Sequence, residues 1–232
     1  MVMRRALDPY QLDRPDAASG IDGTREGDEL VRRRYDRIAP IYDALQAMME
    51  LSAGRWRREL WTGVTGGRVL EIGVGTGKSV PFYPAQADIV AIDISEKMLD
   101  RARRRAARLG AAVRFEVADV QRLPYPDGSF DTALATFVFC SVPDPVRGLS
   151  EVRRVLRPGG RLLLLEHVLS QVRPLRWLMR ALDPLVSRLG GAHLDRETVA
   201  SVGAAGFADV RAANLALDVV KRIEAVAPAA TR

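Results

Sequence analysis

Two kinds of hydrophobic pattern divide the chain into an N-terminal helical part and a longer part built on strands. Over residues 28–64 apolar residues return at three- and four-residue steps. This spacing predicts two short helices within Asp28–Glu50, separated at Pro40, and a third over Arg55–Val64. Further along, short apolar runs predict strands. The expected strands are Arg68–Ile72, Asp88–Asp93, Val113–Val117, Phe130–Phe139, Arg161–His167, Ala208–Leu217 and Asp218–Val226.

The predicted strands alternate with helical or loop crossovers, which is the pattern of a parallel sheet covered on both faces. Helix boundaries support this order. Ser95 is placed to cap a helix that ends at Gly110, and Asp144 with Pro145 opens another. We therefore expect an α/β protein with a doubly wound, Rossmann-like, mostly parallel sheet and an antiparallel C-terminal strand. Such sheets bind ligands beyond the carboxyl ends of their strands.

One domain fits the 232 residues and their 47% hydrophobic content. Residues 1–27 combine Pro, Gly, Asp and Arg without apolar periodicity, so we expect a flexible N-terminal arm there. Residues 28–232 then form the domain. It begins with the helices of residues 28–64 and carries an insertion at residues 172–193.

Charge and cysteine content limit the kinds of partner, metal site and cellular compartment that fit the protein. The net charge is +6, but only three of the 35 basic residues are lysines, so the excess is interpreted as arginine-rich composition on a solvated surface. The single cysteine, Cys140, excludes an internal disulfide and a cysteine-cluster metal site. No apolar run approaches the ~18 residues of a membrane span. We expect a cytoplasmic protein that can still touch a membrane surface.

A glycine-rich turn, residues 73–77, follows the first strand and is the main candidate for a cofactor site. A P-loop needs a glycine where this chain has Ile72, and a dinucleotide-binding turn needs one where it has Lys78. Glu71, two residues before the turn, would repel a pyrophosphate at close range. The sequence therefore favours a cationic ligand.

S-adenosylmethionine (SAM) is such a ligand, since it carries an ammonium and a sulfonium. Asp93, at the tip of the second strand, can accept hydrogen bonds from both ribose hydroxyls. Asp119 follows the third strand and could bind the adenine amino group, with Met98 and Val120 as apolar walls. Acidic residues thus stand at three successive strand ends, where this fold places its ligand.

Several segments make the chain resemble the class I SAM-dependent methyltransferase family. They are VLEIGVGTG (69–77), IDIS (92–95), LPYPDGSFD (123–131) and RPGGR (157–161). Within that family, RYDRIAPIYD (34–43) is similar to the opening segment of quinone-ring and phospholipid-amine methyltransferases. FVFCSVPDP (137–145) is similar to the same group and to membrane-associated thiol methyltransferases.

The resemblance implies a role for each matching residue. Glu71 and the Gly73 backbone would hold the methionine end, Asp93 the ribose and Asp119 the adenine, while Tyr35 closes over the cofactor. The product would be S-adenosylhomocysteine (SAH). The full set of expected cofactor-binding residues is Tyr35, Glu71, Gly73, Gly75, Gly77, Asp93, Ile94, Met98, Asp119, Val120 and Phe137.

Methyl transfer from a sulfonium needs positioning more than catalytic side chains, because the methyl group is already activated. An acceptor amine, phenol or thiol must still lose a proton, and only His167 and His193 offer an imidazole base. His167 ends the fifth strand, so it could equally be bonded within the sheet edge. No metal is expected, because no Cys or close second histidine completes a ligand set.

The identity of the acceptor depends on the insertion. No Asn-Pro-Pro-Tyr motif follows the fourth strand, so we expect no nucleic-acid substrate. Over Val172–Leu189, Leu175, Leu178, Leu182, Leu185 and Leu189 share one stripe, while four arginines lie largely elsewhere. Such a helix can lie on an anionic bilayer as a peripheral contact, or it can be a lid that packs its leucines on the core.

The sequence thus predicts a methyltransferase of a small or amphipathic acceptor. The first expectation is a phospholipid amine such as phosphatidylethanolamine, or a quinone-like ring. A soluble metabolite or thiol is the alternative acceptor, and a non-catalytic SAM-binding regulatory module is the alternative function. The sequence carries no signal of oligomeric state.

Overall fold

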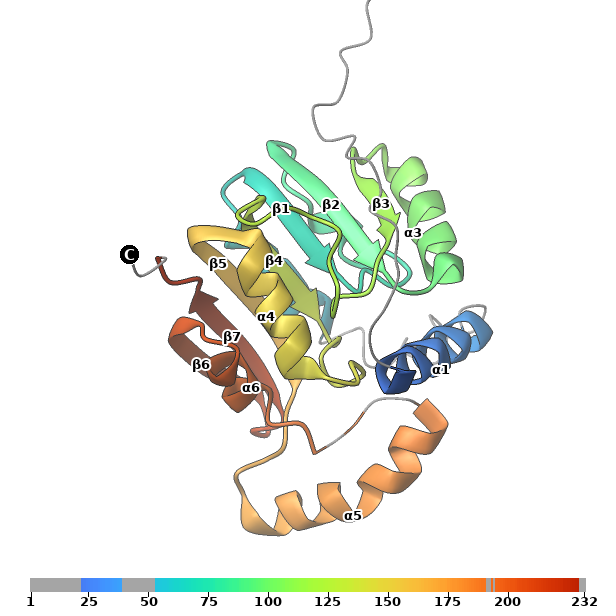
Figure 1. Cartoon of the computed structure of the whole chain (residues 1–232), viewed down its shortest axis with the longest axis vertical. Coiled ribbons are helices and arrows are strands. Elements are labelled where there is room, and N and C mark those ends of the chain that lie inside the picture. The colour runs from blue at the N-terminus through green and yellow to red at the C-terminus, as the bar shows by residue number, and fades with distance from the viewer. Residues whose placement is uncertain (1–21, 39–52, 191–192, 194, 230–232) are drawn as a thin grey trace, which may run out of the picture.

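Seven strands form one sheet in the order β3-β2-β1-β4-β5-β7-β6 (Figure 1). The structure is a computed structural model that describes residues 22–38, 53–190, 193 and 195–229. β1 to β5 run parallel, and β7 is antiparallel to both β5 and β6. The predicted fold class is therefore confirmed. The strands are β1 (Gly67–Ile72), β2 (Ala87–Asp93), β3 (Arg114–Val117), β4 (Phe130–Thr136), β5 (Leu156–His167), β6 (Ala208–Ala216) and β7 (Val220–Val226).

The helices begin where local chemistry caps them. Ser95 accepts a hydrogen bond from the Met98 amide at the start of α3, and Asp144 accepts one from the Arg147 amide at the start of α4. Gly110 ends α3 with a left-handed φ of 64°. The helices are α1 (Asp22–Ile38), α3 (Glu96–Leu109), α4 (Pro145–Val155), α5 (Arg173–Gly190) and α6 (Thr198–Ala204), with a further helix at residues 53–62.

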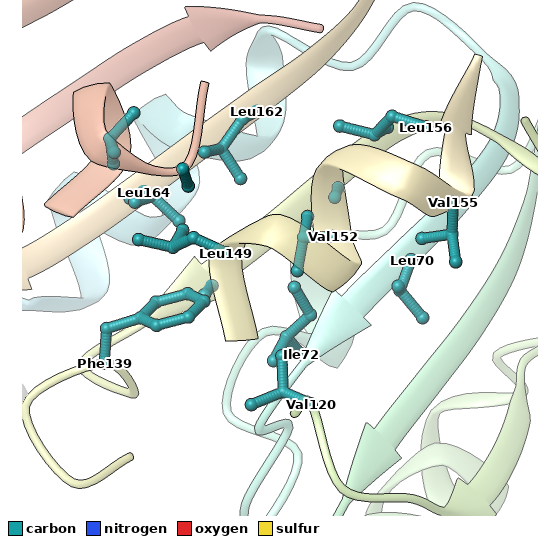
Figure 2. Close-up of a cluster of buried hydrophobic side chains, with 14 of the residues drawn as sticks. Leu70, Ile72, Val120, Phe139, Leu149, Val152, Val155, Leu156, Leu162 and Leu164 are labelled. Carbon is teal, nitrogen blue, oxygen red and sulfur yellow. The ribbon is translucent and has the colours of Figure 1, made fainter. Parts of the chain in front are cut away.

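One face of the sheet is covered by α4 and α6 (Figure 1). Leu149, Val152 and Val155 of α4 are fully buried against side chains of the central strands (Figure 2). Their spacing of three residues places them on one side of the helix. Burial of this kind stabilises each side chain by about 1.5–3 kcal/mol relative to exposure.

The opposite face is covered by α3 and by the helix at residues 53–62. Leu60 and Trp61 of that helix pack on Val69, Ile89 and neighbouring strand residues. The crossover from β1 to β2 contains only a short 3-10 turn, η1 (Val80–Phe82). Because this crossover supplies no full helix, a segment from before the sheet covers the strands instead.

The structure differs from the predictions at several element ends. α1 begins at Asp22, inside the segment assigned to the arm, whereas residues 1–21 and the predicted helix after Pro40 lie outside the described residues. β4 stops at Thr136 because Phe137 has a φ of 57°, which no strand residue adopts. β5 begins at Leu156, five residues early, since Leu156 pairs with Phe130 across a register shift.

Candidate functional site

A cavity opens at the carboxyl ends of β1, β2, β3 and β4. The chain order of the strands reverses between β1 and β4, the point where such sheets bind ligands. The lining residues are Val31, Tyr35, Ile72, Gly73, Gly75, Ile92, Asp93, Ile94, Met98, Ala118, Asp119, Val120, Gln121, Thr136, Phe137, Val138, Ser141, Val142 and Pro143.

Most of the residues predicted to bind a cofactor lie together in this cavity. They are Tyr35, Gly73, Gly75, Asp93, Ile94, Met98, Asp119, Val120 and Phe137. Glu71 and Gly77 are not among the lining residues, and neither are the two candidate bases, His167 and His193. The structure thus gathers residues from α1 and from four strand ends, up to 102 positions apart in the chain, from Tyr35 to Phe137.

Asp93 connects the glycine turn to the next helix. Its Oδ2 accepts a hydrogen bond from the Gly75 amide at 2.9 Å, and its Oδ1 accepts one from the Ser95 amide at 2.9 Å. Burial, with a smaller contribution from the charge of Asp36, raises the pKa of Asp93 to about 6 although these hydrogen bonds lower it. Each carboxylate oxygen keeps a second lone pair that can accept from a ligand.

The glycines of the turn serve different purposes. A Cβ atom at Gly75 would meet no atom within 4 Å, so this part of the turn faces open space in the cavity. A Cβ atom at Gly73 would lie 2.5 Å from Val138, and one at Gly77 would lie 3.0 Å from Ala102 of α3. Gly73 and Gly77 are therefore required by packing as well as by their positive φ.

Asp119 is held at the cavity by Gln121. The Gln121 amide nitrogen of the backbone donates to Asp119 Oδ1 at 2.8 Å, and the buried Gln121 side chain accepts from the Asp144 amide at 3.0 Å. This chain of bonds links the third strand end to the start of α4. The Asp119 carboxylate is thereby fixed in a partly exposed position where it can accept a further hydrogen bond.

Helix α1 covers one side of the cavity. The Tyr35 hydroxyl lies 2.8 Å from Ser141 Oγ, and the Ser95 hydroxyl donates to Asp36 Oδ1 at 2.6 Å. Val31, one turn before Tyr35, also lines the cavity. The side of α1 that bears these residues is thus docked over the strand ends, where Tyr35 was predicted to close.

Glu71 has an environment unlike that of Asp93. Its carboxylate is buried and accepts hydrogen bonds from the hydroxyls of Ser79 and Tyr83. Burial raises its pKa, while the nearby buried Arg57 lowers it. In this arrangement Glu71 joins the helix at residues 53–62 to the glycine turn, and its contact with a cofactor remains a prediction.

The wall after β4 rests on a buried glutamate that sequence reasoning did not single out. Oε1 of Glu166 accepts hydrogen bonds from the amides of Val138 and Phe139 at 2.9 and 3.0 Å. Its Oε2 has no hydrogen-bond partner among the described residues. Because Glu166 is fully buried, its pKa rises to about 7.

His167 does not line the cavity itself but contacts Phe137, which does. The two rings stack with centroids 4.4 Å apart and planes inclined by 22°. Burial lowers the pKa of His167, so the imidazole is neutral near pH 7. Cys140, beside this wall, is buried with its pKa raised to about 12, which makes it an inert packing residue.

His193 lies in the segment that follows α5. Its amide donates to the carbonyl of Cys140 at 2.9 Å, and its Nδ1 lies 3.2 Å from Asp183 Oδ2. Asp195 joins these two residues in a cluster whose potential ligand atoms all lie within 4.8 Å of one another. We assign no metal to this cluster, because the Nδ1 of His193 already pairs with Asp183 and methyl transfer needs no Lewis acid.

The contacts that the sequence did not reveal join segments far apart in the chain. Ser95, Asp36 and Glu166 act through contacts with residues 27 to 59 positions away, which no local pattern indicates. The segment FVFCSVPDP, noted in the sequence for its family resemblance, contributes Ser141, Val142 and Pro143 to the cavity wall. Its role in lining the cavity depends on the turn that begins at Phe137.

These groups fit a sulfonium nucleoside. Open space beside Gly75 admits a ligand close to the backbone, two carboxylates are placed to accept from hydroxyl and amino groups, and Met98 and Val120 supply apolar walls. The fold and the cavity together define a SAM-dependent methyltransferase.

Comparison with known proteins supports the assignment to the methyltransferases. Residues 70–164 match a family model described as "Methyltransferase domain". Over 164 residues the chain is 38% identical to a phosphatidylethanolamine N-methyltransferase of Cereibacter sphaeroides, covering 70% of this chain and 80% of that protein. It is 33% identical to a demethylmenaquinone methyltransferase of Clavibacter sepedonicus, covering 86% and 91% of the two chains. The chain belongs to the class I SAM-dependent methyltransferases, in the group that contains these two activities.

A solved structure shares the fold at lower identity. The structure described as "Phospholethanolamine N-methyltransferase 2" of Haemonchus contortus, in complex with phosphomonomethylethanolamine and SAH, has a TM-score of 0.59 and 19% identity. The alignment covers 71% of this chain and 50% of that chain. Such a likeness concerns the fold alone.

Proposed function

We propose that this enzyme methylates an acceptor carried by a lipid, in the first place the amine of a phospholipid head group. The observation that carries the proposal is the exposure of apolar side chains on α5: Trp177 is 73% exposed, Leu178 46% and Leu182 42%. These leucines belong to the stripe that a lid would bury on the core. An exposed apolar face beside arginines is suited to a bilayer interface, so residues 172–189 are proposed as a peripheral membrane contact.

A quinone-like ring is the second candidate acceptor. Phe137 offers an aromatic wall in the cavity, and its stacking on His167 holds that ring in place. A flat ring packs well against such a face. The relative from Clavibacter sepedonicus is named for demethylmenaquinone, which is consistent with this alternative. No described helix is long and apolar enough to cross a bilayer.

We assign the cofactor contacts from the geometry of the cavity. Asp93 accepts from the ribose hydroxyls, Asp119 from the adenine amino group, and the backbone at Gly73 and Gly75 borders the methionine end. Tyr35 covers the site from α1. SAM, when bound, supplies a methyl group already activated by its sulfonium, so the chain contributes orientation and exclusion of water.

His193 is the base that we propose for the acceptor amine, which must lose a proton before it can attack. Asp183 is paired with Nδ1, so the carboxylate would stabilise the imidazolium that forms when Nε2 takes the proton. His193 is 39% exposed through its side chain, which leaves it accessible. His167, in contrast, contacts Phe137 and is proposed to position that ring.

The test is transfer of labelled methyl groups from SAM to three acceptors: phosphatidylethanolamine vesicles, vesicles with a demethylated quinone, and free ethanolamine. We expect label in the phospholipid, and a His193→Gln variant should lower kcat by roughly 10²-fold to 10⁴-fold with little change in SAM binding. Transfer to the quinone alone would favour the second candidate. Equal transfer to free ethanolamine would overturn the lipid-borne acceptor, and SAM binding without any transfer would favour a regulatory module.

A further inference from the structure

The turn between β6 and β7 carries a leucine at a position where it does not stabilise the isolated protein. Leu217 and Asp218 are the central residues of the turn, with φ values of 42° and 57°, and the Val219 amide donates to the Ala216 carbonyl at 2.9 Å. Turns with two positive φ values favour Asn, Asp or Gly. Leu217 is 86% exposed, so it is unfavourable both in backbone conformation and in hydration.

Asp218 fastens this turn to the start of α5. Its Oδ2 accepts from the Gln171 amide at 2.6 Å and from the Ser170 hydroxyl at 3.3 Å, while Lys221 pairs with Oδ1 at 2.6 Å. The hydrogen bond from Lys221 is the main cause that lowers the pKa of Asp218. The hairpin tip is therefore held to the segment that leads into α5, and the exposed Leu217 is the neighbour of Asp218 in that tip.

Helix α5 directs its apolar residues in two directions. Met179 and Asp183, four residues apart, are buried, with Leu175 half-buried on the same side. Trp177, Leu178 and Leu182 are exposed on the other sides. The exposed apolar residues of both elements make up what we call the α5–hairpin surface: Val172, Trp177, Leu178, Leu182 and Leu217.

The charges beside α5 are mostly positive: Arg173, Arg176 and Arg180 stand against the exposed carboxylate of Glu197, which pairs with Arg176 at 2.6 Å and lies 3.8 Å from Arg180. Within residues 171–184 of the described chain, the exposed side chains include Arg173 and Arg180 but no carboxylate. Asp183, the acid of this stretch, is buried. Arginines beside exposed Trp and Leu side chains complement anionic lipid head groups over an apolar interior. A second copy of the chain would instead set these arginines against each other.

We propose that the α5–hairpin surface binds an anionic lipid bilayer through both elements, with Leu217 entering the interface. The proposal rests on the lipid-borne acceptor argued above and adds the hairpin as a second point of attachment. Two separated points fix the orientation of the domain on the surface, which a single helix leaves free to rotate about its own axis.

The experiment measures sedimentation of the full chain with vesicles of phosphatidylcholine and phosphatidylglycerol in a 3:1 ratio. The key variant is Leu217→Asn, since asparagine accepts a positive φ and should leave the fold as stable as before. The matched control is Leu109→Asn, which changes a leucine that is 53% exposed at the end of α3, near the opposite edge of the sheet.

We expect Leu217→Asn to weaken vesicle binding by roughly fivefold or more, because the variant loses a leucine that would be buried in the bilayer interface. Leu109→Asn should bind vesicles like wild type. Equal binding by all three proteins would overturn the role of the hairpin. If the wild-type chain does not bind vesicles but forms a concentration-dependent dimer that Leu217→Asn abolishes, a second copy of the chain and not the bilayer covers the α5–hairpin surface, and the proposal is overturned. If Leu217→Asn weakens vesicle binding but neither the phosphatidylethanolamine vesicles nor the quinone vesicles of the transfer assay gain label, the surface stands and the lipid acceptor falls.

Discussion

Carboxylates at equivalent strand ends behave differently because their neighbours differ. Glu71 and Asp93 both end buried strands, yet Asp93 lines the cavity whereas Glu71 is bonded to Tyr83 and lies near Arg57. Tyr83 and Arg57 lie at least 12 positions from Glu71, so its sequence context does not reveal them. We therefore propose that attraction of a cationic cofactor rests mainly on Asp93 and Asp119.

Glu166 provides a test of the wall after β4. Its pKa in the folded protein, about 7, is above its ordinary value of 4.5. Proton binding therefore favours folding, and this stabilisation is complete below about 4.5 and lost as the pH rises through about 7. A Glu166→Gln variant keeps an oxygen to accept from Val138 and Phe139 and never ionises. Its stability relative to wild type should rise between pH 5 and 8 by up to about 3 kcal/mol.

Thermal unfolding of both proteins across that pH range measures this difference. A Glu59→Gln change, at an exposed glutamate, controls for the loss of a surface charge. Parallel curves for Glu166→Gln and wild type would mean that Glu166 does not titrate there. A large loss of stability at every pH would mean that the amide cannot replace the carboxyl in its bonds to the loop.

At the scale of elements, helices with local caps were predicted well and segments shaped by distant contacts were not. Ser95 and Asp144 accept hydrogen bonds from amides three residues away, so short stretches of sequence determine where α3 and α4 begin. The end of β4 depends on Glu166, which holds the following loop from another strand. The orientation of α5 also escaped the leucine pattern, because Met179 rather than Leu178 or Leu182 is buried.

The docking of α1 makes a prediction about cofactor retention. Tyr35→Phe removes the hydrogen bond to Ser141 and keeps the ring. A hydrogen bond of this kind contributes about 0.5–1.5 kcal/mol, so SAH affinity should fall roughly two- to tenfold if α1 closes over the cofactor. Calorimetric titration with SAH measures the change.

A double-mutant cycle identifies the partner. Ser141→Ala should weaken SAH binding by a similar factor, and the double variant should be little worse than either single one. Additive losses would show that the two hydroxyls act separately. Unchanged affinity in all variants would mean that α1 does not cover the bound cofactor.

For the whole molecule, the order of strands and helices followed from the sequence, since alternation of apolar runs with capped helices leaves few arrangements of a parallel sheet. The strand-end aspartates of the site followed from the same reasoning. What could not be predicted is which segments meet over the cavity: Val31 from α1 and Pro143 before α4 line it together although they are far apart in the chain. The acceptor side depends on such long-range contacts throughout.

Cofactor binding should stabilise the entire domain. SAH at 100 times its Kd adds about 2.7 kcal/mol to the free energy of unfolding, which corresponds to a rise in Tm of roughly 5–10 °C. ATP and NAD at the same concentration should leave Tm unchanged, because an adenosine held by Asp93 and Asp119 would place their phosphates at the glycine turn, close to Glu71. Asp93→Asn should reduce the shift given by SAH, and a shift with ATP instead would contradict the assigned class of ligand.

The thin crossover between β1 and β2 has a consequence for dividing this enzyme into parts. Leu60 and Trp61 pack on Val69 and Ile89 together with Phe82 and Tyr83 of the crossover, although they precede the recognisable methyltransferase region at residues 70–164. A truncated chain that began at Gly67 would lose part of this cover and expose apolar strand residues to water. The unit that folds is therefore larger than the region of the sequence motifs, and any truncated or fused version of the enzyme must include the helix at residues 53–62.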